Sequence, residues 1–315
     1  MMKKFALLIL TLLTVFGVSA CQNDSSADIV TTMFTQYDFA RQIVQDKMTV
    51  SMIIPPGAEI HNYEATSKDI VAINEAKLFI FTSLEIDQWI GDPSNLGGDD
   101  TIVMNLSEHY TLEDHNHEHD TLTLSLIEDE HEHDDEIHYW VDPVVAMQLI
   151  DAILENIILI DPIHETFYRS NAEAYKEEIH ELHESFDLWM QDGHIDQQIF
   201  FAGHNAMGLF GERYHLTITS LFESFKPDAD LTSAELIAFT EAVKAANVHY
   251  LFIEELVDPK AANQIKDELS RENYDLVLLP LHAYHNLTKN EFSEGISYVD
   301  LFIRNIDNIK IAIGD

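Results

Sequence analysis

A stretch of about thirty residues constrains the fold of this chain more than any other feature. Between Asp161-Pro162 and Gly193 the sequence has no glycine and no further proline, and apolar residues recur at alternating spacings of four and three. This periodicity predicts one α-helix with a single apolar face, about 45 Å long. A coiled-coil partner could cover that face, but only about four heptads are present, so we predict that the helix packs across two lobes of one chain. The face consists of Tyr168, Ala172, Tyr175, Ile179, Leu182, Phe186 and Trp189.

Short apolar runs alternate with helical segments on both sides of this helix, an order typical of a parallel sheet. The predicted fold class is α/β, with two lobes of mainly parallel sheets flanked by helices and bridged by the long helix. We place the N-terminal lobe at 28–160, the linking helix at 161–193 and the C-terminal lobe at 194–315. Predicted strands lie at 29–34, 48–54, 77–82, 101–106, 198–202, 216–221, 248–253 and 275–279, and predicted helices at 37–44, 67–74, 142–158, 206–214, 233–246, 259–273 and from about Ser293 onward.

The N-terminus has the features of a secretory signal. Lys3 and Lys4 precede an apolar stretch at 5–18, which is too short for a confident membrane span. The segment Val18-Ser19-Ala20-Cys21 resembles a bacterial lipobox, in which cleavage leaves the cysteine as a lipid-bearing N-terminus. We therefore predict a signal peptide at 1–20, a polar tether at 21–27 and anchoring through Cys21 on the extracytoplasmic face of the cell membrane; the alternative is a free thiol that ends the signal.

Composition excludes several classes of function. Cys21 is the only cysteine, so the chain can form neither an internal disulfide nor a cysteine zinc site. The formal net charge of −39 argues against nucleic-acid binding. The same negative field would concentrate divalent cations near the surface, although it could equally serve solubility or adaptation to a salty habitat.

Four histidines stand in settings that favour a shared metal site. With 17 histidines in the chain, most cannot be ligands of one ion. However, His61, His204 and His282 each follow the end of a predicted strand, and His138 lies at the start of a helix. Ligands of parallel α/β sheets bind at the carboxyl ends of strands. Because two of these histidines lie in each half and imidazole is the commonest zinc ligand, we predict one metal site in a cleft between the halves.

A second histidine-rich feature lies between the first two of these residues. In the loop at 113–137, His115, His117, His119, His131 and His133 alternate with Asp and Glu. Such tracts indicate metal binding by composition. A solvated acidic loop that binds nothing specifically is the alternative.

Taken together, these residues resemble the metal-binding lipoprotein component of zinc and manganese ABC importers. The resemblance rests on the lipobox and on three segments, at 55–63, 138–143 and 203–214, and it covers nearly the whole chain. It implies a metal-filled cleft with limited closure, Zn2+ as the transported ligand, a cognate ABC permease as partner, a monomer and no enzymatic activity. The first three ligand positions of the family fall on His61, His138 and His204. A histidine at the third position favours the zinc branch over the manganese branch.

The fourth ligand is less well defined by the resemblance. Related proteins often carry a carboxylate after a Leu-x-Pro-Leu-like strand end, and here His282 occupies that place. Four neutral imidazoles would form a closed tetrahedral zinc site. His285, Glu254, Glu59 or water could take the fourth position instead. The histidine-rich loop falls where the family carries a variable loop, which could gather zinc or sense its excess.

Two other functions use the same features. Three histidines and a water on zinc also describe hydrolytic enzymes, with Glu254 or Glu59 available as a general base. A fourth histidine counts against this reading because it closes the coordination shell. A lipid-anchored adhesin is the second alternative, but no sequence feature indicates a surface for binding macromolecules.

Overall fold

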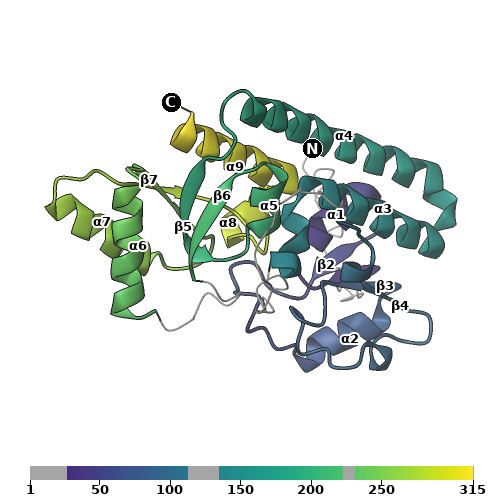
Figure 1. Cartoon of the computed structure of the whole chain (residues 1–315). Coiled ribbons are helices and arrows are strands. Elements are labelled where there is room, and N and C mark those ends of the chain that lie inside the picture. Colours follow the sequence, from purple (N-terminus) through teal and green to yellow (C-terminus); the bar gives the residue numbers. More distant parts are fainter. Residues whose placement is uncertain (1–26, 113–134, 223–230, 315) are drawn as a thin grey trace, which may run out of the picture.

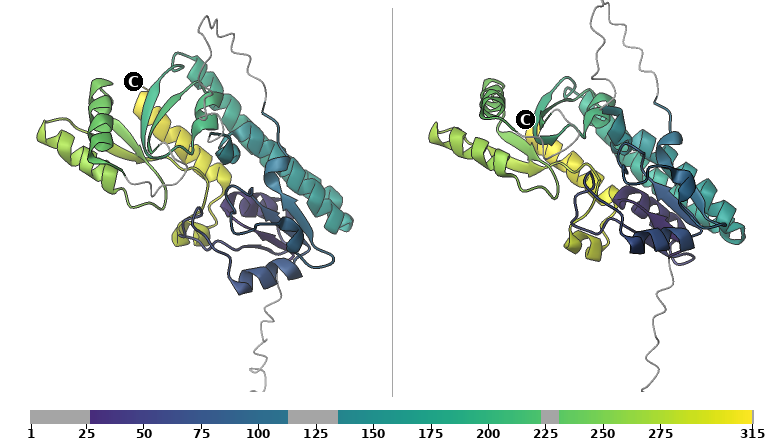
Figure 2. Two further views of the ribbon diagram at one scale, coloured as in Figure 1. Left: turned by 60° about the horizontal axis from the view of Figure 1, so that its bottom comes forward. Right: turned by 90° about the horizontal axis from the view of Figure 1, so that it is seen from below.

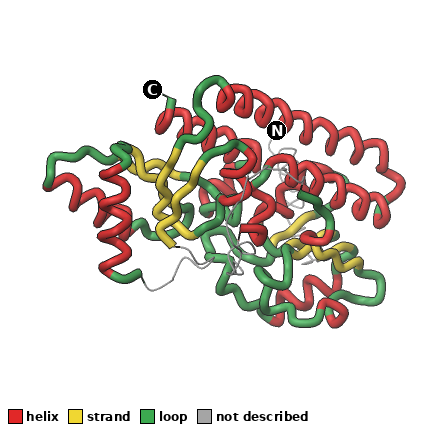
Figure 3. Tube along the Cα trace, viewed as in Figure 1, coloured by secondary structure: helices red, strands yellow, loops and turns green. Residues whose placement is uncertain are grey.

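The computed structural model describes residues 27–112, 135–222 and 231–314. The predicted signal peptide, Cys21 and the five histidines of the histidine-rich loop lie outside the described residues. Two separate parallel sheets dominate the remainder (Figures 1 and 3). The predicted fold class is therefore confirmed.

The N-terminal lobe contains the first sheet, whose strands are all parallel in the order β2-β1-β3-β4. Its two interior strands, β1 and β3, are buried along their whole length, as expected for a parallel sheet covered on both faces. The elements of this lobe are β1 (Ile29–Thr31), α1 (Phe34–Val44), β2 (Val50–Met52), α2 (Ser67–Glu75), β3 (Leu78–Phe81), β4 (Ile102–Asn105) and α3 (Pro143–Ile160), with short 3-10 turns at Pro93–Asn95, Leu106–Glu108 and Asp135–Val141.

The C-terminal lobe repeats this strand order. Its parallel sheet runs β6-β5-β7-β8, so the first strand in sequence again lies inside the sheet, beside the second and third. Helices α6 and α7 lie at the outer edge of this lobe, away from the N-terminal lobe (Figure 2). The elements are β5 (Gln198–His204), α5 (Gly208–Arg213), β6 (Thr217–Phe222), α6 (Ser233–Ala245), β7 (Tyr250–Ile253), α7 (Lys260–Arg271) and β8 (Val277–Pro280).

The long helix α4 (Glu165–Gln191) bridges the lobes as predicted, after a 3-10 turn at Pro162–His164. It packs against α1 and α3 of the N-terminal lobe and against the last helix, α9 (Tyr298–Ile313) (Figure 1). Five residues of its predicted face are buried, and Leu182 and Trp189 are half-buried. Helix α3 is long and apolar enough to cross a membrane, but its apolar residues pack between α1 and α4, which accounts for its composition.

The terminal helix differs from the prediction. The terminal helix that we expected from about Ser293 is two helices, because Gly295 adopts a left-handed conformation with φ of 75° that ends α8 (Lys289–Glu294). A new capping box formed by Ser297 and Asp300 then starts α9. Helix α6 begins at Ser233 as predicted, and the side chain of Thr232 caps it by accepting a hydrogen bond from the backbone of Glu235.

A short segment of the C-terminal half is built into the N-terminal lobe. We call residues 281–287, which follow β8, the crossing segment. Its backbone carbonyls and the Asn286 amide bond to α1, to the loop after β2 and to Trp140. These bonds join Thr35 Oγ1 to Tyr284 O (2.8 Å), Phe34 N to His285 O (3.2 Å), Asn286 Nδ2 to Pro55 O and Ala58 O (both 2.9 Å), Gly57 N to Leu287 O (2.7 Å) and Trp140 Nε1 to Ala283 O (2.9 Å).

One hydrophobic core therefore runs through both lobes. It joins residues such as Phe81 of β3, Ile179 of α4 and Phe302 of α9. A second, smaller core lies between the second sheet and helices α6 and α7, with Phe200, Val243 and Leu269 among its members. The lobes thus share most of their apolar interior, and only the outer face of the C-terminal lobe has a core of its own.

Asp38 of α1 ties three helices together in the shared core. Its buried carboxylate accepts hydrogen bonds from the hydroxyl of Tyr175, the backbone N–H of Tyr298 and the guanidinium of Arg41. We expect Asp38→Ala to lower the free energy of unfolding by about 3 kcal/mol, since the buried hydroxyl of Tyr175 and N–H of Tyr298 lose this acceptor. Urea denaturation of the zinc-free protein would measure this loss. Asp46→Ala, which removes an exposed carboxylate, is the control and should leave the transition unchanged.

Candidate metal centre

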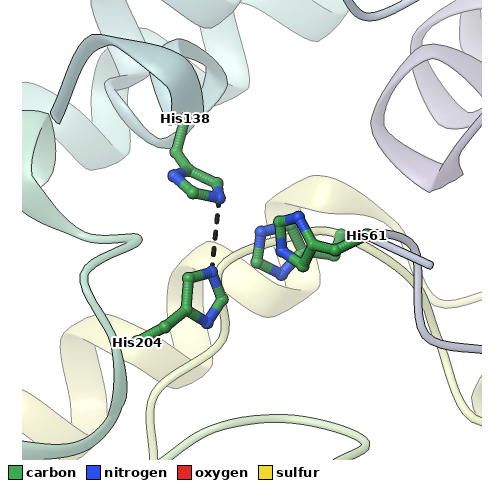
Figure 4. Close-up of side chains that lie close together, drawn as sticks. His61, His138 and His204 are labelled. Atoms are coloured by element: carbon green, nitrogen blue, oxygen red, sulfur yellow. Dashed lines mark hydrogen bonds between the residues drawn. The ribbon is translucent and has the colours of Figure 1, made fainter. Parts of the chain in front are cut away.

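Four histidines converge between the lobes. His61, His138, His204 and His285 are all buried, and each offers a ring nitrogen within 4.8 Å of the other three. Figure 4 shows His138 and His204 facing each other, with His61 beside them. Among the residues that the structure describes, this is the only cluster of three or more His, Cys, Asp or Glu side chains with metal-binding geometry.

Local structure brings each imidazole to the cluster. His61 follows β2 in a turn where Glu59 accepts its backbone N–H (2.9 Å). His138 interrupts the 3-10 turn before α3 with a non-helical backbone (φ −97°, ψ 45°). His204 is the last residue of β5, next to a register irregularity in its pairing with β6. His285 lies in the crossing segment, directly after Tyr284, whose φ is 61°.

The distances fit a tetrahedral ion. The Nε2 atoms of His138 and His204 are 3.3 Å apart. Two imidazole nitrogens on a tetrahedral zinc, each at about 2.0–2.1 Å, would be separated by about 3.3–3.4 Å. All six pairs of ring centroids lie between 5.0 and 5.6 Å, so no ring stands apart from the others. The arrangement can therefore hold one small cation with four nitrogen ligands.

The surroundings favour neutral imidazole at His138. Burial holds the pKa of His138 well below its usual range, and the neighbouring histidines act in the same direction. Trp140 lies edge-on to His138 and His285, with ring centroids at 5.4 and 5.7 Å, and helps to wall off the site. Zinc binds the neutral ring, so a low imidazole pKa keeps this ligand available at neutral pH.

Two carboxylates lie behind the imidazoles, on the first two residues after β7. Glu254 Oε1 is 2.8 Å from His204 Nδ1, and Glu255 Oε1 is 3.0 Å from His285 Nδ1. Burial alone would lower the pKa of His285, but the carboxylates of Glu255, Glu254 and Glu59 together raise that pKa. Burial likewise opposes ionisation of Glu255, yet its pKa is lowered because His282 and His285 face it. We did not single out Glu255 from the sequence, where only its position beside Glu254 pointed to it.

The structure corrects the fourth member of the cluster. We expected His282, but His285 joins His61, His138 and His204, and His282 lies outside the group. Instead, the Nδ1 of His282 accepts the backbone N–H of Tyr284 (2.8 Å). The backbone N–H of His282 donates to the side-chain Oδ1 of Asn305 (2.8 Å). His282 thus shapes the turn that carries His285. The left-handed backbone at Tyr284, which a motif match to the strand end cannot show, brings His285 rather than His282 to the cluster. The identity of the fourth ligand stays a proposal.

The two candidate carboxylates, Glu254 and Glu59, lie beside rings of the cluster but are not members of it. Glu254 contacts His204 from behind, and Glu59 uses its carboxylate to accept the backbone N–H groups of His61 and Asn62. Water is not needed to complete the set, because four imidazoles already converge. The cluster contains His61, His138 and His204, the three other histidines expected from the sequence.

The chain is similar to proteins of zinc uptake. A family model described as "Zinc-uptake complex component A periplasmic" matches residues 29–312. The high-affinity zinc uptake system protein ZnuA of Bacillus subtilis is 29% identical over 324 residues, covering 99% of each chain. The zinc-binding lipoprotein AdcA of Streptococcus pneumoniae is 28% identical over 98% of this chain but only 61% of its own length.

Solved structures show the same fold. The metal-dependent lipoprotein YcdH from Bacillus subtilis superposes with a TM-score of 0.72 at 26% identity, covering 90% of this chain and 98% of that one. The Zn(II)-bound ZnuA-like domain of Streptococcus pneumoniae AdcA gives a TM-score of 0.70 at 23% identity, covering 92% and 100%. Because the family model spans both sheets, the bridging helix and all four histidines of the cluster, this chain belongs to the zinc-uptake complex component A family.

Proposed function

We propose that this protein captures Zn2+ outside the cytoplasm and delivers it to an ABC permease. The observation that carries the proposal is the buried cluster of four imidazoles, His61, His138, His204 and His285, drawn from both lobes. Membership of the zinc-uptake family and the zinc-binding names of its relatives support it. We assign no catalytic residues, because four converging nitrogens leave no open coordination position for a reacting water.

The lobes hold the ion unequally. His204 ends a strand of the C-terminal sheet, whereas His61 and His138 belong to the N-terminal lobe and His285 to the crossing segment bonded into it. A bound zinc ion would therefore join His204 to three ligands fixed on the other side. Limited movement of the C-terminal sheet would remove one ligand and leave three, which gives the permease a weaker site to empty.

We expect one tight zinc-binding event and a clear preference for zinc over manganese. Imidazole suits zinc, whereas manganese prefers carboxylate and other oxygen ligands. Isothermal titration calorimetry on protein that begins at Gln22, with both metals competing, would test this. Manganese binding as tight as zinc binding would contradict the proposal and support the manganese-importer alternative.

We further propose that Cys21 carries a lipid that anchors the protein on the extracytoplasmic face of the membrane, and that the protein acts as a monomer. The lipobox-like residues Val18-Ser19-Ala20 before Cys21 support the anchor. We expect Cys21→Ser to release most of the protein from the membrane fraction without changing its zinc affinity, because the cluster contains no cysteine. Cell fractionation would measure the release; a variant that stayed in the membrane fraction would refute the anchor.

A further inference from the structure

Two adjacent carboxylates at the end of β7 are buried beside the cluster. The side chains of Glu254 and Glu255 are only 5% and 8% exposed. Neighbouring buried carboxylates repel each other and lose hydration, so such a pair is costly unless each finds donors or a nearby cation. Each of these two carboxylates faces a different imidazole of the cluster.

Glu254 is fitted closely to His204. Besides the contact with Nδ1, its Oε2 accepts the backbone N–H of His204 at 3.2 Å. Gly203 makes room for this carboxylate: a Cβ at that position would lie 2.9 Å from Glu254 Oε2 and 2.6 Å from the ring of Phe201. Glu254, which directly follows the neighbouring strand β7, therefore holds the backbone of His204 by a hydrogen bond. Its Oε1 also lies 2.8 Å from the Nδ1 of His204, a close ionic contact outside hydrogen-bonding geometry.

Glu255 holds the crossing segment in the same way. Its Oε1 faces His285 Nδ1, and its Oε2 accepts the backbone N–H of Ala283 at 3.0 Å. A proton on Nδ1 leaves the lone pair on Nε2. That Nε2 is buried and has no hydrogen-bond partner in the structure, which suits an atom reserved for a metal.

We propose that Glu254 and Glu255 are positioning residues. Glu254 fixes His204 through its backbone N–H and its close approach to Nδ1, and Glu255 fixes His285 with Nδ1 protonated and Nε2 directed at the ion. This inference rests on the proposed zinc-binding function. Four neutral imidazoles leave a bound zinc ion with its full double charge, and the two carboxylates balance that charge inside the protein. The two residues that follow β7 thereby orient His204 of the C-terminal lobe and His285 of the crossing segment.

A set of double-mutant cycles tests the pairing. Zinc affinity is measured by chelator competition for Glu254→Gln, Glu255→Gln, His204→Ala, His285→Ala and the four carboxylate–histidine double variants. Each Glu→Gln change alone should weaken zinc binding about 10–100-fold. In the matched pairs, 254 with 204 and 255 with 285, the Glu→Gln change should cost much less, because its imidazole is already gone. In the crossed pairs, 254 with 285 and 255 with 204, the losses of zinc-binding free energy from the two single variants should add.

A spectroscopic readout separates positioning from charge. In zinc-free protein with 15N-labelled histidine, NMR should show His285 protonated at Nδ1, and Glu255→Gln should reduce that population. Glu255→Asp keeps the charge but withdraws the carboxylate, so it should also weaken zinc binding. Asp258→Asn, which removes an exposed carboxylate a few residues along the same loop, is the control for long-range charge and should bind zinc like the unmodified protein.

The outcomes distinguish this inference from the function on which it rests. If the unmodified protein bound no zinc, the proposed function would fail before any cycle was measured. If it bound zinc but matched and crossed pairs gave equal coupling, or Glu255→Asp bound zinc normally, the positioning roles would be overturned while zinc capture stood.

Discussion

Replacing His204 with alanine is expected to weaken zinc binding on the order of 10²–10³-fold. Structural zinc sites bind with about 10–16 kcal/mol, so one of four ligands accounts for about 3–4 kcal/mol. His204 is also the member of the cluster carried by the C-terminal sheet, so the variant loses the link between that sheet and the ion. Water can fill the vacated coordination position, so the variant should still bind zinc weakly.

Chelator competition and the zinc content of purified protein would both report this loss. His249→Ala is a suitable control, because His249 is exposed and its Nδ1 contacts only the backbone carbonyl of Asp275. Comparable zinc affinity in the His204→Ala variant and the unmodified protein would show that the cluster does not bind the ion as proposed.

His285→Ala should weaken zinc binding about 100-fold, whereas His282→Ala should cost about tenfold or less. His285 offers a ring nitrogen to the cluster. His282 acts on it indirectly, through the backbone N–H of Tyr284, the side-chain oxygen of Asn305 and the carboxylate of Glu255. The two histidines are three residues apart, so this pair of variants isolates the role of one ring. The reverse order of effects would restore His282, the ligand expected from the sequence.

A zinc-bound crystal structure would test the same assignment directly. It should place His285 Nε2 at about 2.0–2.1 Å from the ion. If the structure placed His282 at that distance instead, the crossing segment would have to adopt a different turn in the bound state.

The fold could be predicted from the sequence because the patterns that mark strands and helices are local and recur along the chain. β-branched and apolar runs marked each strand, and the absence of glycine and proline between Pro162 and Gly193 marked α4. The same patterns placed His61, His138 and His204 at strand ends and helix starts, where the cluster now lies. Within each sheet the strand-end positions of His61 and His204 follow from element order, since carboxyl ends of parallel strands meet at one edge.

The remaining features depend on contacts between distant residues. The choice between His282 and His285 is made by the turn at Tyr284 and by the hydrogen bonds of Asn305, which no pattern around residue 282 reveals. The role of Glu255 requires knowing that β7 and β8 are neighbours. The lobe boundaries at 160 and 193 stay a prediction.

The crossing segment also determines how the molecule can fold. Thr35 bonds to Tyr284 across 249 positions of sequence, and Asp38 bonds to Tyr298 across 260. Contacts this remote are slow to form, because a long stretch of chain must be ordered before they stabilise anything. During synthesis, α1 emerges early, yet its partners in the crossing segment and α9 are made last. The N-terminal lobe is therefore not a separate folding unit, and its interior can close only when nearly the whole chain is present.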